Sequence, residues 1–175
     1  QEILAANKAM ADQALRVLCA AQRLWSDLPQ DTRIVSTGFS MGGLAALVYP
    51  MFANREIAGV VANSPVCNLL EHFHERRDLP RTLLNAFISY PDGLEEGLRS
   101  RSPIHRIDAM KRIPYFIVAG GADDQVSKAN HADPLVKLMR DKNFDITYHE
   151  IPTMRHWHIN DYDVWKSMMD FITER

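Results

Sequence analysis

The sequence has few cysteines, no excess of basic residues and no long apolar runs, and each of these absences argues against a class of protein. Its two cysteines, Cys19 and Cys67, fall in a predicted helix and after a predicted strand, which favours buried free thiols over a disulfide framework or a metal site. The formal net charge of −2 argues against a nucleic-acid-binding protein, which needs a basic field. No apolar run approaches the roughly 18 residues of a membrane span. We therefore expect no nucleic acid and no membrane among the partners.

Cofactor and targeting signals are missing as well. Gly120-Gly121 is not part of a Gly-x-Gly-x-x-Gly fingerprint, so nothing indicates a dinucleotide, and no other cofactor is expected. The chain starts with Gln1 rather than Met, and no capping residue precedes the apolar pair Ile3-Leu4. We expect a processed protein or the C-terminal portion of a longer one. No signal peptide is visible, so a cytoplasmic and a secreted or periplasmic location both stay open.

The composition is that of a globular domain, with 46% hydrophobic and 24% charged residues. The 175 residues correspond to about one domain, and we predict a single domain over residues 1–175. Apolar residues at steps of three and four predict one long amphipathic helix over residues 2–28, which Pro29 ends.

Four segments, 33–39, 57–62, 114–119 and 145–151, are predicted to form strands. The second and third are continuously apolar, as strands buried on both faces are, which favours a parallel sheet. The fourth alternates apolar and polar residues, as a half-exposed strand does. Strands that alternate with helices form a parallel α/β sheet with right-handed crossovers, and this is the predicted fold class.

Two helical regions are predicted on either side of the second strand. The first covers 41–52, where Pro50 indicates that the regular helix ends near Tyr49. The long charged stretch 66–113 carries apolar residues at helical spacing, interrupted by prolines and glycines. It is predicted to form two or three short helices without a strand.

Two more helices are predicted in the C-terminal third of the chain. Asp133 followed by Pro134 has the form of an N-cap with proline at the first helical position, and this helix is expected to run to about residue 142. The last helix is expected to start near residue 160. Four residues are predicted on its buried face: Val164, Trp165, Met168 and Ile172.

The stretch Thr37-Gly38-Phe39-Ser40-Met41-Gly42-Gly43 contains a Gly-x-Ser-x-Gly pattern between a predicted strand and a predicted helix. Strand, sharp turn and helix form the context of a nucleophile elbow, which holds a serine hydroxyl out of the sheet where a base can reach it. Glycine is expected at 38 and 42 because a tight turn leaves no room for a Cβ beside the strained serine. A glycine-rich turn without catalysis is the alternative interpretation, and a partner acid and base would decide against it.

Polar residues follow three of the predicted strands. Ser40 follows the first strand, Asp123 lies in the stretch after the third, and His156 lies in the stretch after the fourth. In open α/β sheets, ligands bind beyond the C-terminal ends of the strands. A nucleophile, an acid and a base are therefore predicted at one edge of the sheet, in the chain order Ser, Asp, His.

This arrangement resembles the α/β-hydrolase superfamily, and in particular its prolyl-oligopeptidase-like and carboxylesterase branch. That branch often has Gly-x-x-Asp-x-x-Val at the acid, matched here by Gly120, Asp123 and Val126, and Pro-x-x-x-His at the base, matched by Pro152 and His156. The resemblance runs from about residue 30 to the C-terminus. It implies the C-terminal part of an α/β-hydrolase fold that lacks its N-terminal strands, because such enzymes have several more strands before the elbow. One of those earlier loops supplies an oxyanion donor, and no matching segment is present.

The resemblance, together with the chemistry of these groups, gives four residues a catalytic role. Ser40 would be the nucleophile, activated by His156 as the base that later protonates the leaving group. Asp123 would hold the imidazole in the required tautomer and stabilise the imidazolium. The backbone N–H of Met41 would be one oxyanion donor.

Other positions near the motifs are expected to shape substrate binding. Phe39 and Trp157, next to the nucleophile and the base, are predicted to contact the substrate. The helical segment 66–113 is expected to cap the site, with apolar residues that set acyl specificity. Within that segment, His72 and His74 are interpreted as part of a solvated helical face.

Two neighbouring residues compete for the acid and base roles. Asp124 could be the acid, but the Asp-x-x-Val match favours Asp123. His158 could be the base, but the Pro-x-x-x-His spacing favours His156. The two histidines could bind a metal, but no cysteine or carboxylate lies at ligand spacing nearby, so no metal site is expected.

We therefore predict a serine hydrolase that cleaves carboxylic esters through an acyl-enzyme with a Ser-Asp-His triad. A prolyl-oligopeptidase-like serine peptidase and a catalytically silent α/β-hydrolase-fold binding protein are the alternatives. The expected substrate is a small ester or peptide. Along the outer edge of the strand at 33–39, we expect an upstream segment of the same protein or a partner subunit, because a bare apolar edge invites pairing.

Overall fold

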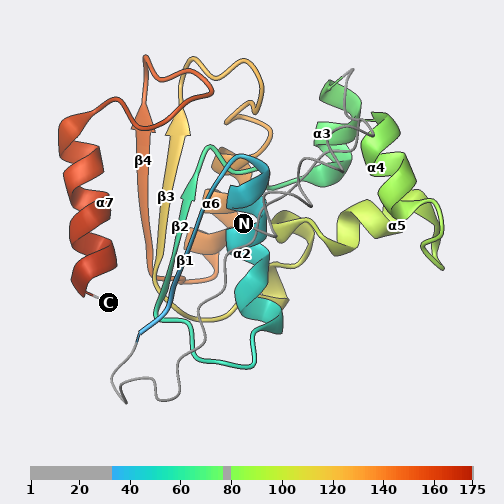
Figure 1. Cartoon of the computed structure of the whole chain (residues 1–175), viewed down its shortest axis with the longest axis horizontal. Coiled ribbons are helices and arrows are strands. Elements are labelled where there is room, and N and C mark those ends of the chain that lie inside the picture. The colour runs from blue at the N-terminus through green and yellow to red at the C-terminus, as the bar shows by residue number, and fades with distance from the viewer. Residues whose placement is uncertain (1–32, 77–79, 175) are drawn as a thin grey trace, which may run out of the picture. The chain divides into compact units, whose positions relative to one another are not determined.

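The computed structural model describes residues 33–76 and 80–174, and these contain a four-stranded parallel sheet (Figure 1). Its strands are β1 (Val35–Phe39), β2 (Gly59–Asn63), β3 (Tyr115–Gly120) and β4 (Ile146–Ile151), in that spatial order. Every adjacent pair is parallel. A parallel pair needs a crossover connection, and the helices between the strands supply it. The predicted parallel α/β sheet and its four strands are confirmed.

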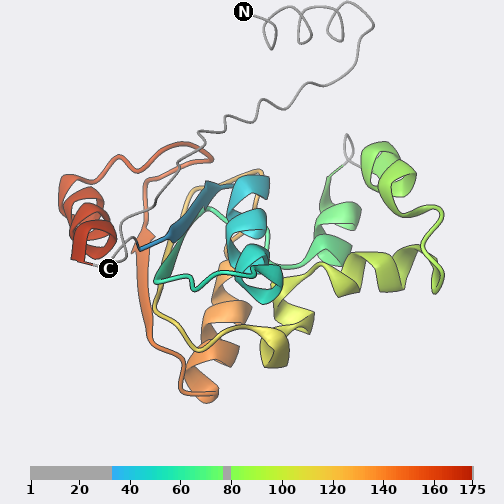
Figure 2. The ribbon, with the colours of Figure 1, turned by 60° about the horizontal axis from the view of Figure 1, so that its bottom comes forward.

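Helices cover both faces of this sheet. Figure 1 shows α7 (Tyr162–Glu174) on one face, and α2 (Met41–Phe52) with α6 (Ala132–Asp141) on the other. Three further helices lie together beside the sheet, as Figure 2 shows from a second side: α3 (Leu69–Glu75), α4 (Pro80–Phe87) and α5 (Gly93–Ser100). Two single turns of 3-10 helix, η1 (Pro103–His105) and η2 (Ile107–Ala109), lead back to β3. The described part of 66–113 thus forms short helices without a strand, as predicted.

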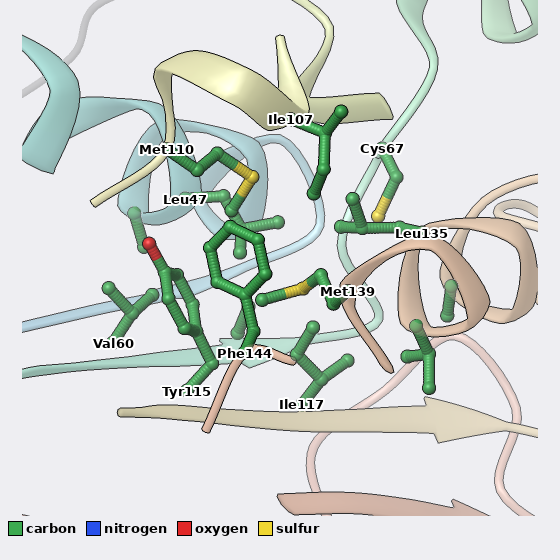
Figure 3. Close-up of a cluster of buried hydrophobic side chains, with 14 of the residues drawn as sticks. Leu47, Val60, Cys67, Ile107, Met110, Tyr115, Ile117, Leu135, Met139 and Phe144 are labelled. Carbon is green, nitrogen blue, oxygen red and sulfur yellow. The ribbon is translucent and has the colours of Figure 1, made fainter. Parts of the chain in front are cut away.

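The largest hydrophobic core lies between the sheet and the helices α2 and α6 (Figure 3). Val60 and Ile117 of the sheet meet Leu47 of α2 and Leu135 and Met139 of α6, and all five side chains are fully buried. Burying one such side chain contributes about 1.5–3 kcal/mol relative to leaving it in water. This core fixes the strands from whose ends the candidate site is built.

A second core lies beneath α7. Phe171 is buried there, and its ring centroid lies 5.5 Å from that of Phe116. The predicted residues Val164, Met168 and Ile172 are partly buried in the same core. The prediction for Trp165 is wrong, because this side chain is 45% exposed and stacks on Tyr162. Trp165 lies about 100° around the helix from Val164, at the margin of the buried face beside the partly buried Ile172, where a ring as large as indole extends into solvent.

Helix α2 covers the predicted range 41–52, but its regular part does not end near Tyr49 as expected and instead continues through Pro50 to Phe52. Pro50 removes a single N–H from the helix, and its ring is buried. The N–H of Ala53 donates to the carbonyl of Tyr49 over 3.0 Å, which closes one more turn. Packing and this hydrogen bond outweigh the local preference of the residue before proline.

Helix α6 begins at Ala132, with His131 at the N-cap position, so the predicted cap at Asp133 is wrong. Pro134 is the third helical residue, where its missing N–H costs little because the first four N–H groups of a helix have no helical partner. The Asp133 carboxylate instead accepts hydrogen bonds from Lys128 and Tyr148, each over 2.7 Å.

Strand β1 differs from its neighbours in burial. Within the described part of the chain it pairs only with β2, and Thr37 and Phe39 are exposed. All six residues of β3 are buried, by contrast. The strand that leads into Ser40 therefore forms one edge of the described sheet.

Some expectations lie outside the described residues, among them the helix over 2–28 and Cys19. The described residues belong to one compact unit, Arg33–Arg175, and the single domain over 1–175 stays a prediction. In the described ranges, no helix combines the length and apolar character needed to cross a bilayer.

Candidate active site

Ser40 occupies the sharp turn between β1 and α2. Its backbone has φ 57° and ψ −121°, a sparsely populated conformation that costs about 1–3 kcal/mol for a residue with a side chain. The surrounding backbone holds the turn, because the N–H of Ser40 donates to Asn63 over 2.9 Å and the N–H of Val66 donates to Ser40 over 3.3 Å. Asn63 is the last residue of β2, and Val66 lies three residues beyond it. The strand-turn-helix context expected of the elbow is therefore present.

The glycines around Ser40 do not all have the same steric role. A Cβ at Gly38 would lie 2.0 Å from the carbonyl oxygen of Gly42, so no other residue fits there. A Cβ at Gly42 would meet no atom within 4 Å among the described residues, and the predicted collision at this position is wrong. Gly43 is the second crowded position, since its Cβ would lie 2.9 Å from Cβ of Pro65.

Asp123 lies in the loop after β3, and its side chain is 1% exposed. Its Oδ1 accepts hydrogen bonds from the backbone N–H groups of Gln125 and Val126, both over 2.9 Å. These bonds orient the carboxylate so that Oδ2 faces His156. A buried carboxylate needs such donors, because an unpaired buried charge is costly.

The loop that carries Asp123 is joined to the loop that carries His156. The N–H of Gly121 donates to Ile151 over 2.9 Å, and the N–H of Ala122 donates to Met154 over 3.1 Å. A Cβ at Gly120 would lie 2.3 Å from the carbonyl oxygen of Met154, so glycine permits this close approach. The glycine pair after β3 therefore serves to bring the acid and the base together.

The imidazole of His156 connects Asp123 to Ser40. Its Nδ1 lies 2.8 Å from Oδ2 of Asp123, and its Nε2 lies 2.9 Å from Oγ of Ser40. A carboxylate only accepts hydrogen bonds, so Nδ1 carries the proton and Nε2 is free to accept the proton of the serine hydroxyl. The His156 side chain is 9% exposed, which keeps most water away from this chain of hydrogen bonds.

The two competing residues lie elsewhere. Asp124 is exposed and forms an ion pair with Arg155 over 2.8 Å, and this hydrogen bond with Arg155 lowers the pKa of Asp124. His158 is exposed, and its ring contacts Trp157. Among the described residues, the geometry therefore brings Asp123 and His156 to Ser40, and neither Asp124 nor His158.

The three remaining predicted site residues flank Ser40 and His156. Met41 is the first residue of α2, so its N–H has no helical acceptor and is available to a ligand. Phe39 is 41% exposed, and its ring centroid lies 4.8 Å from that of His156. Trp157 is 65% exposed, and its carbonyl accepts a hydrogen bond from Asn63 over 3.5 Å.

A cavity of about 470 Å³ opens between α2 and α4 beside Met41. Six of its apolar lining residues are Met41, Leu44, Val48, Leu69, Leu83 and Phe87. The contribution of α2 to this cavity was not expected from the sequence. The signal was present, because α2 carries a second apolar stripe, one helical face away from the residues that meet the sheet.

Two buried side chains lie outside the Ser40–His156–Asp123 chain: Cys67, whose burial was predicted, and His72, whose burial was not. Cys67 is buried, as predicted, and burial raises the pKa of its thiol well above the usual range, which disfavours the reactive thiolate form. His72 is 2% exposed, and its interpretation as part of a solvated face is wrong, whereas His74 is exposed. Together with Glu75 and His131, His72 forms a group whose possible ligand atoms lie within 4.8 Å of one another.

Comparisons with known proteins agree on the fold. A puromycin-hydrolyzing peptidase from Mycobacterium tuberculosis is 18% identical, with a TM-score of 0.66 over 94% of this chain and 23% of that one. The acylaminoacyl peptidase of Pyrococcus horikoshii is 17% identical, with a TM-score of 0.65 over 81% of this chain and 24% of that one. Dipeptidyl peptidase 4 of Porphyromonas gingivalis is 19% identical, with a TM-score of 0.64 over 81% of this chain and 19% of that one.

The chain spans about a quarter of the length of the first two of these structures. A search of curated protein sequences found no match. The model of the prolyl oligopeptidase family matches residues 6–175, which is nearly the whole chain. The chain therefore belongs to the prolyl oligopeptidase family, a family of serine hydrolases with the α/β-hydrolase fold.

Proposed function

We propose that this chain carries the catalytic site of a serine hydrolase that cleaves carboxylic esters through an acyl-enzyme. The observation that supports this proposal is the continuous hydrogen-bonded chain Ser40–His156–Asp123. A serine hydroxyl is a weak nucleophile until a base removes its proton, and His156 Nε2 lies within reach of that proton. The strained backbone of Ser40 fixes Oγ in place before the substrate arrives.

In the proposed first step, Oγ of Ser40 attacks the ester carbonyl carbon while its proton moves to Nε2 of His156. The carbonyl oxygen becomes an oxyanion, and the N–H of Met41 donates a hydrogen bond to it. One such donor contributes about 3 kcal/mol of transition-state stabilisation in enzymes of this kind. Asp123 stabilises the imidazolium and holds its tautomer.

The tetrahedral intermediate then breaks its bond to the leaving oxygen, which takes the proton from Nε2 of His156. The alcohol departs and Ser40 carries the acyl group. In the second half of the cycle, a water gives its proton to His156 and its oxygen attacks the acyl carbon. The proton returns to Oγ of Ser40 as the carboxylic acid leaves, so the enzyme is regenerated.

An ester is proposed as the substrate for two reasons. An ester carbonyl is less stabilised by resonance than an amide carbonyl, and an alkoxide leaves more easily than an amide anion, so an ester needs less help from oxyanion donors than an amide does. The apolar cavity beside Met41 has the volume and lining of a site for the acyl group. A serine peptidase is the second candidate, favoured by the peptidases among the structural neighbours.

We also propose that the outer edge of β1 pairs with another polypeptide segment, an upstream part of the same protein or a partner subunit. Two observations support this: the exposed Thr37 and Phe39 on an edge strand, and the open space beside Gly42. Exposed strand edges are templates for pairing. A loop that approaches Gly42 would lie close to the Met41 N–H and could supply a second oxyanion donor.

The test uses a fluorophosphonate, which reacts with an activated serine. We expect it to label wild-type protein at Ser40 and to leave Ser40→Ala unlabelled, with any other serine unreactive. Peptide mapping by mass spectrometry identifies the labelled residue. Labelling that persists in Ser40→Ala refutes the assignment, and a folded wild type that is not labelled supports a catalytically silent binding protein. Paired p-nitrophenyl esters and p-nitroanilides with the same acyl group then separate an esterase from a peptidase.

A further inference from the structure

Helix α3 and the loop that carries Asp123 are joined by buried polar side chains that the proposed mechanism does not use. His72 and His131 are 2% and 0% exposed. The Glu75 carboxylate lies between them, with Oε2 at 3.1 Å from Nε2 of His131 and at 4.0 Å from Nδ1 of His72. Buried polar groups of this kind are costly unless they are hydrogen-bonded, so their arrangement requires an explanation.

Two histidines and one carboxylate have the composition of a zinc site, but the hydrogen bonds of His131 argue against a metal. The backbone N–H of Asn68 donates to Nδ1 of His131 over 3.3 Å. Nδ1 therefore carries no proton, and in the neutral ring the proton is on Nε2, where it is donated to Glu75. A metal on Nε2 would force a proton onto Nδ1, opposite the N–H of Asn68. When His131 donates to Glu75, both of its ring nitrogens have a hydrogen-bond partner. When it binds a metal through Nε2, its Nδ1 proton would face the N–H of Asn68.

The same carboxylate binds a second residue of the loop. Oε1 of Glu75 accepts a hydrogen bond from the side-chain amide of Asn130, which directly precedes His131. The next residue of the chain, Arg76, donates to Oε1 of Gln125 over 3.1 Å. The end of α3 thus contacts the loop at its middle and at its end.

The Arg76 contact leads directly to the Asp123 carboxylate, whereas Glu75 acts on it along the loop, through Asn130 and His131. Gln125, which Arg76 holds by its side chain, donates its backbone N–H to Oδ1 of Asp123 over 2.9 Å. The beginning of the loop is fixed separately, by the hydrogen bond from Gly121 to Ile151. Beyond Asp123 the loop is also anchored by Val126, which is buried in the core that contains Leu44, and by Lys128, which pairs with Glu150 over 3.1 Å. The contacts to α3 hold the remaining stretch, from Gln125 on one side and at residues 130 and 131 on the other.

We propose that Glu75 is a positioning residue for hydrolysis: through His131 and Asn130 it holds the loop so that the Asp123 carboxylate faces His156. This inference rests on the proposed function, because it concerns the same Ser40–His156–Asp123 chain. Glu75 does not touch the reacting atoms and acts through the loop alone. Catalytic groups displaced by about 1 Å lose about 100-fold in rate, so this support has a measurable effect.

The test compares Glu75→Ala and Glu75→Gln with wild type and with Glu95→Ala. Glu95 is a matched control, because it is another carboxylate of the helical segment, and among the described residues its one ion-pair partner is Arg99 on the surface. We expect Glu75→Ala to lower kcat for p-nitrophenyl acetate by about 10- to 100-fold with little change in KM. Glu75→Gln should retain activity within about threefold. The glutamine amide oxygen can accept the hydrogen bond from His131, and the glutamine NH₂ can donate to Oδ1 of Asn130 once the Asn130 amide has rotated. Glu95→Ala should behave as wild type.

A second readout does not depend on turnover. The Nδ1–H of His156 donates to a carboxylate and should give a downfield proton resonance, assigned by its loss in His156→Gln. We expect this resonance to broaden or disappear in Glu75→Ala and to persist in Glu75→Gln and Glu95→Ala. Asn130→Ala, which removes one contact at the exposed end of the loop, provides a milder variant if Glu75→Ala does not fold, and it should show a smaller effect of the same kind.

Three outcomes overturn the positioning role. One is an unchanged resonance in folded Glu75→Ala, and another is a loss of activity in Glu75→Gln as large as in Glu75→Ala. The third is tight one-to-one binding of Zn²⁺ to wild type in calorimetry that Glu75→Gln abolishes, which would make the cluster a metal site. Failure of the proposed function is seen separately, as the absence of fluorophosphonate labelling at Ser40 in a wild type that still gives the His156 resonance.

Discussion

A methyl group on Gly38 would lie 2.0 Å from the carbonyl oxygen of Gly42, whereas a methyl group on Gly42 itself would touch nothing within 4 Å among the described residues. The two glycines of the Gly-x-Ser-x-Gly pattern therefore have different roles. Gly38 allows the strand to approach the first turn of α2, and this approach sets the angle at which Ser40 leaves the sheet. Gly42 leaves an open surface beside the Met41 N–H.

Gly38→Ala is expected to destabilise the protein by about 3 kcal/mol or more, because the backbone of the elbow must move to accept the methyl group. Gly42→Ala should leave stability unchanged or raise it by up to about 1 kcal/mol, since alanine is the better helix former and its Cβ has room. Urea unfolding of both variants measures the difference. Equal destabilisation of the two would contradict the geometry of the elbow.

The acid loop makes a similar distinction between two adjacent carboxylates. Asp123→Asn should reduce kcat by about 10⁴-fold, the loss found when the triad acid of a serine protease is made neutral and the histidine tautomer is lost. Asp124→Asn removes only an exposed ion pair with Arg155, and its activity should stay within about twofold of wild type. Ester hydrolysis by the two purified variants decides the matter, and the reverse ranking would move the acid role to Asp124.

Several features of the site could be predicted from the sequence because they depend on local rules. The buried strands are continuously apolar, and the ends of parallel strands meet at one edge, so Ser40, Asp123 and His156 could be placed together without coordinates. The family motifs favoured Asp123 over Asp124 as the acid and His156 over His158 as the base. The alternation of strands and helices was enough to predict a parallel sheet flanked by helices.

The features that were missed depend on contacts between distant segments. His72 lies among charged residues of a short helix, which in sequence indicates a solvated face, yet the loop before α6 covers it. The N-cap of α6 moved from Asp133 to His131 because Lys128 and Tyr148 bind the Asp133 carboxylate. Local spacing does not show these contacts: His131, which covers His72, lies more than fifty residues away along the chain, and Tyr148, one of the two partners of Asp133, lies on β4.

Burial gives the protein a predicted pH dependence of stability through His72. Burial, with smaller effects from His131 and Arg76 opposed by Glu75, lowers the pKa of His72 from 6.5 to about 4. Between these values the unfolded chain binds a proton that the folded chain does not, so stability falls as the pH drops from about 6.5 to about 4 and levels off below. The full difference corresponds to about 3 kcal/mol.

Urea unfolding at pH 7 and pH 4.5 measures this effect, and His72→Phe should reduce the loss of stability between the two values. The exposed His74 provides the control, since His74→Gln should leave the loss unchanged. A pH dependence that is the same in wild type and His72→Phe would assign the effect to other groups.

The cavity between α2 and α4 makes the acyl preference testable. Ala45 lies on the α2 face that lines this cavity, so Ala45→Phe should fill part of its volume without disturbing Ser40 or Met41. We expect kcat/KM for p-nitrophenyl octanoate to fall by about tenfold or more, while the value for p-nitrophenyl acetate stays within twofold, because a short acyl group does not reach the filled region. Ala109→Phe, at an exposed alanine outside the cavity, is the matched control and should leave both values unchanged. If Ala45→Phe lowers kcat/KM equally for both esters, or for neither, the acyl chain binds elsewhere. The exposed ring of Phe39, which contacts His156, is then the next surface to alter.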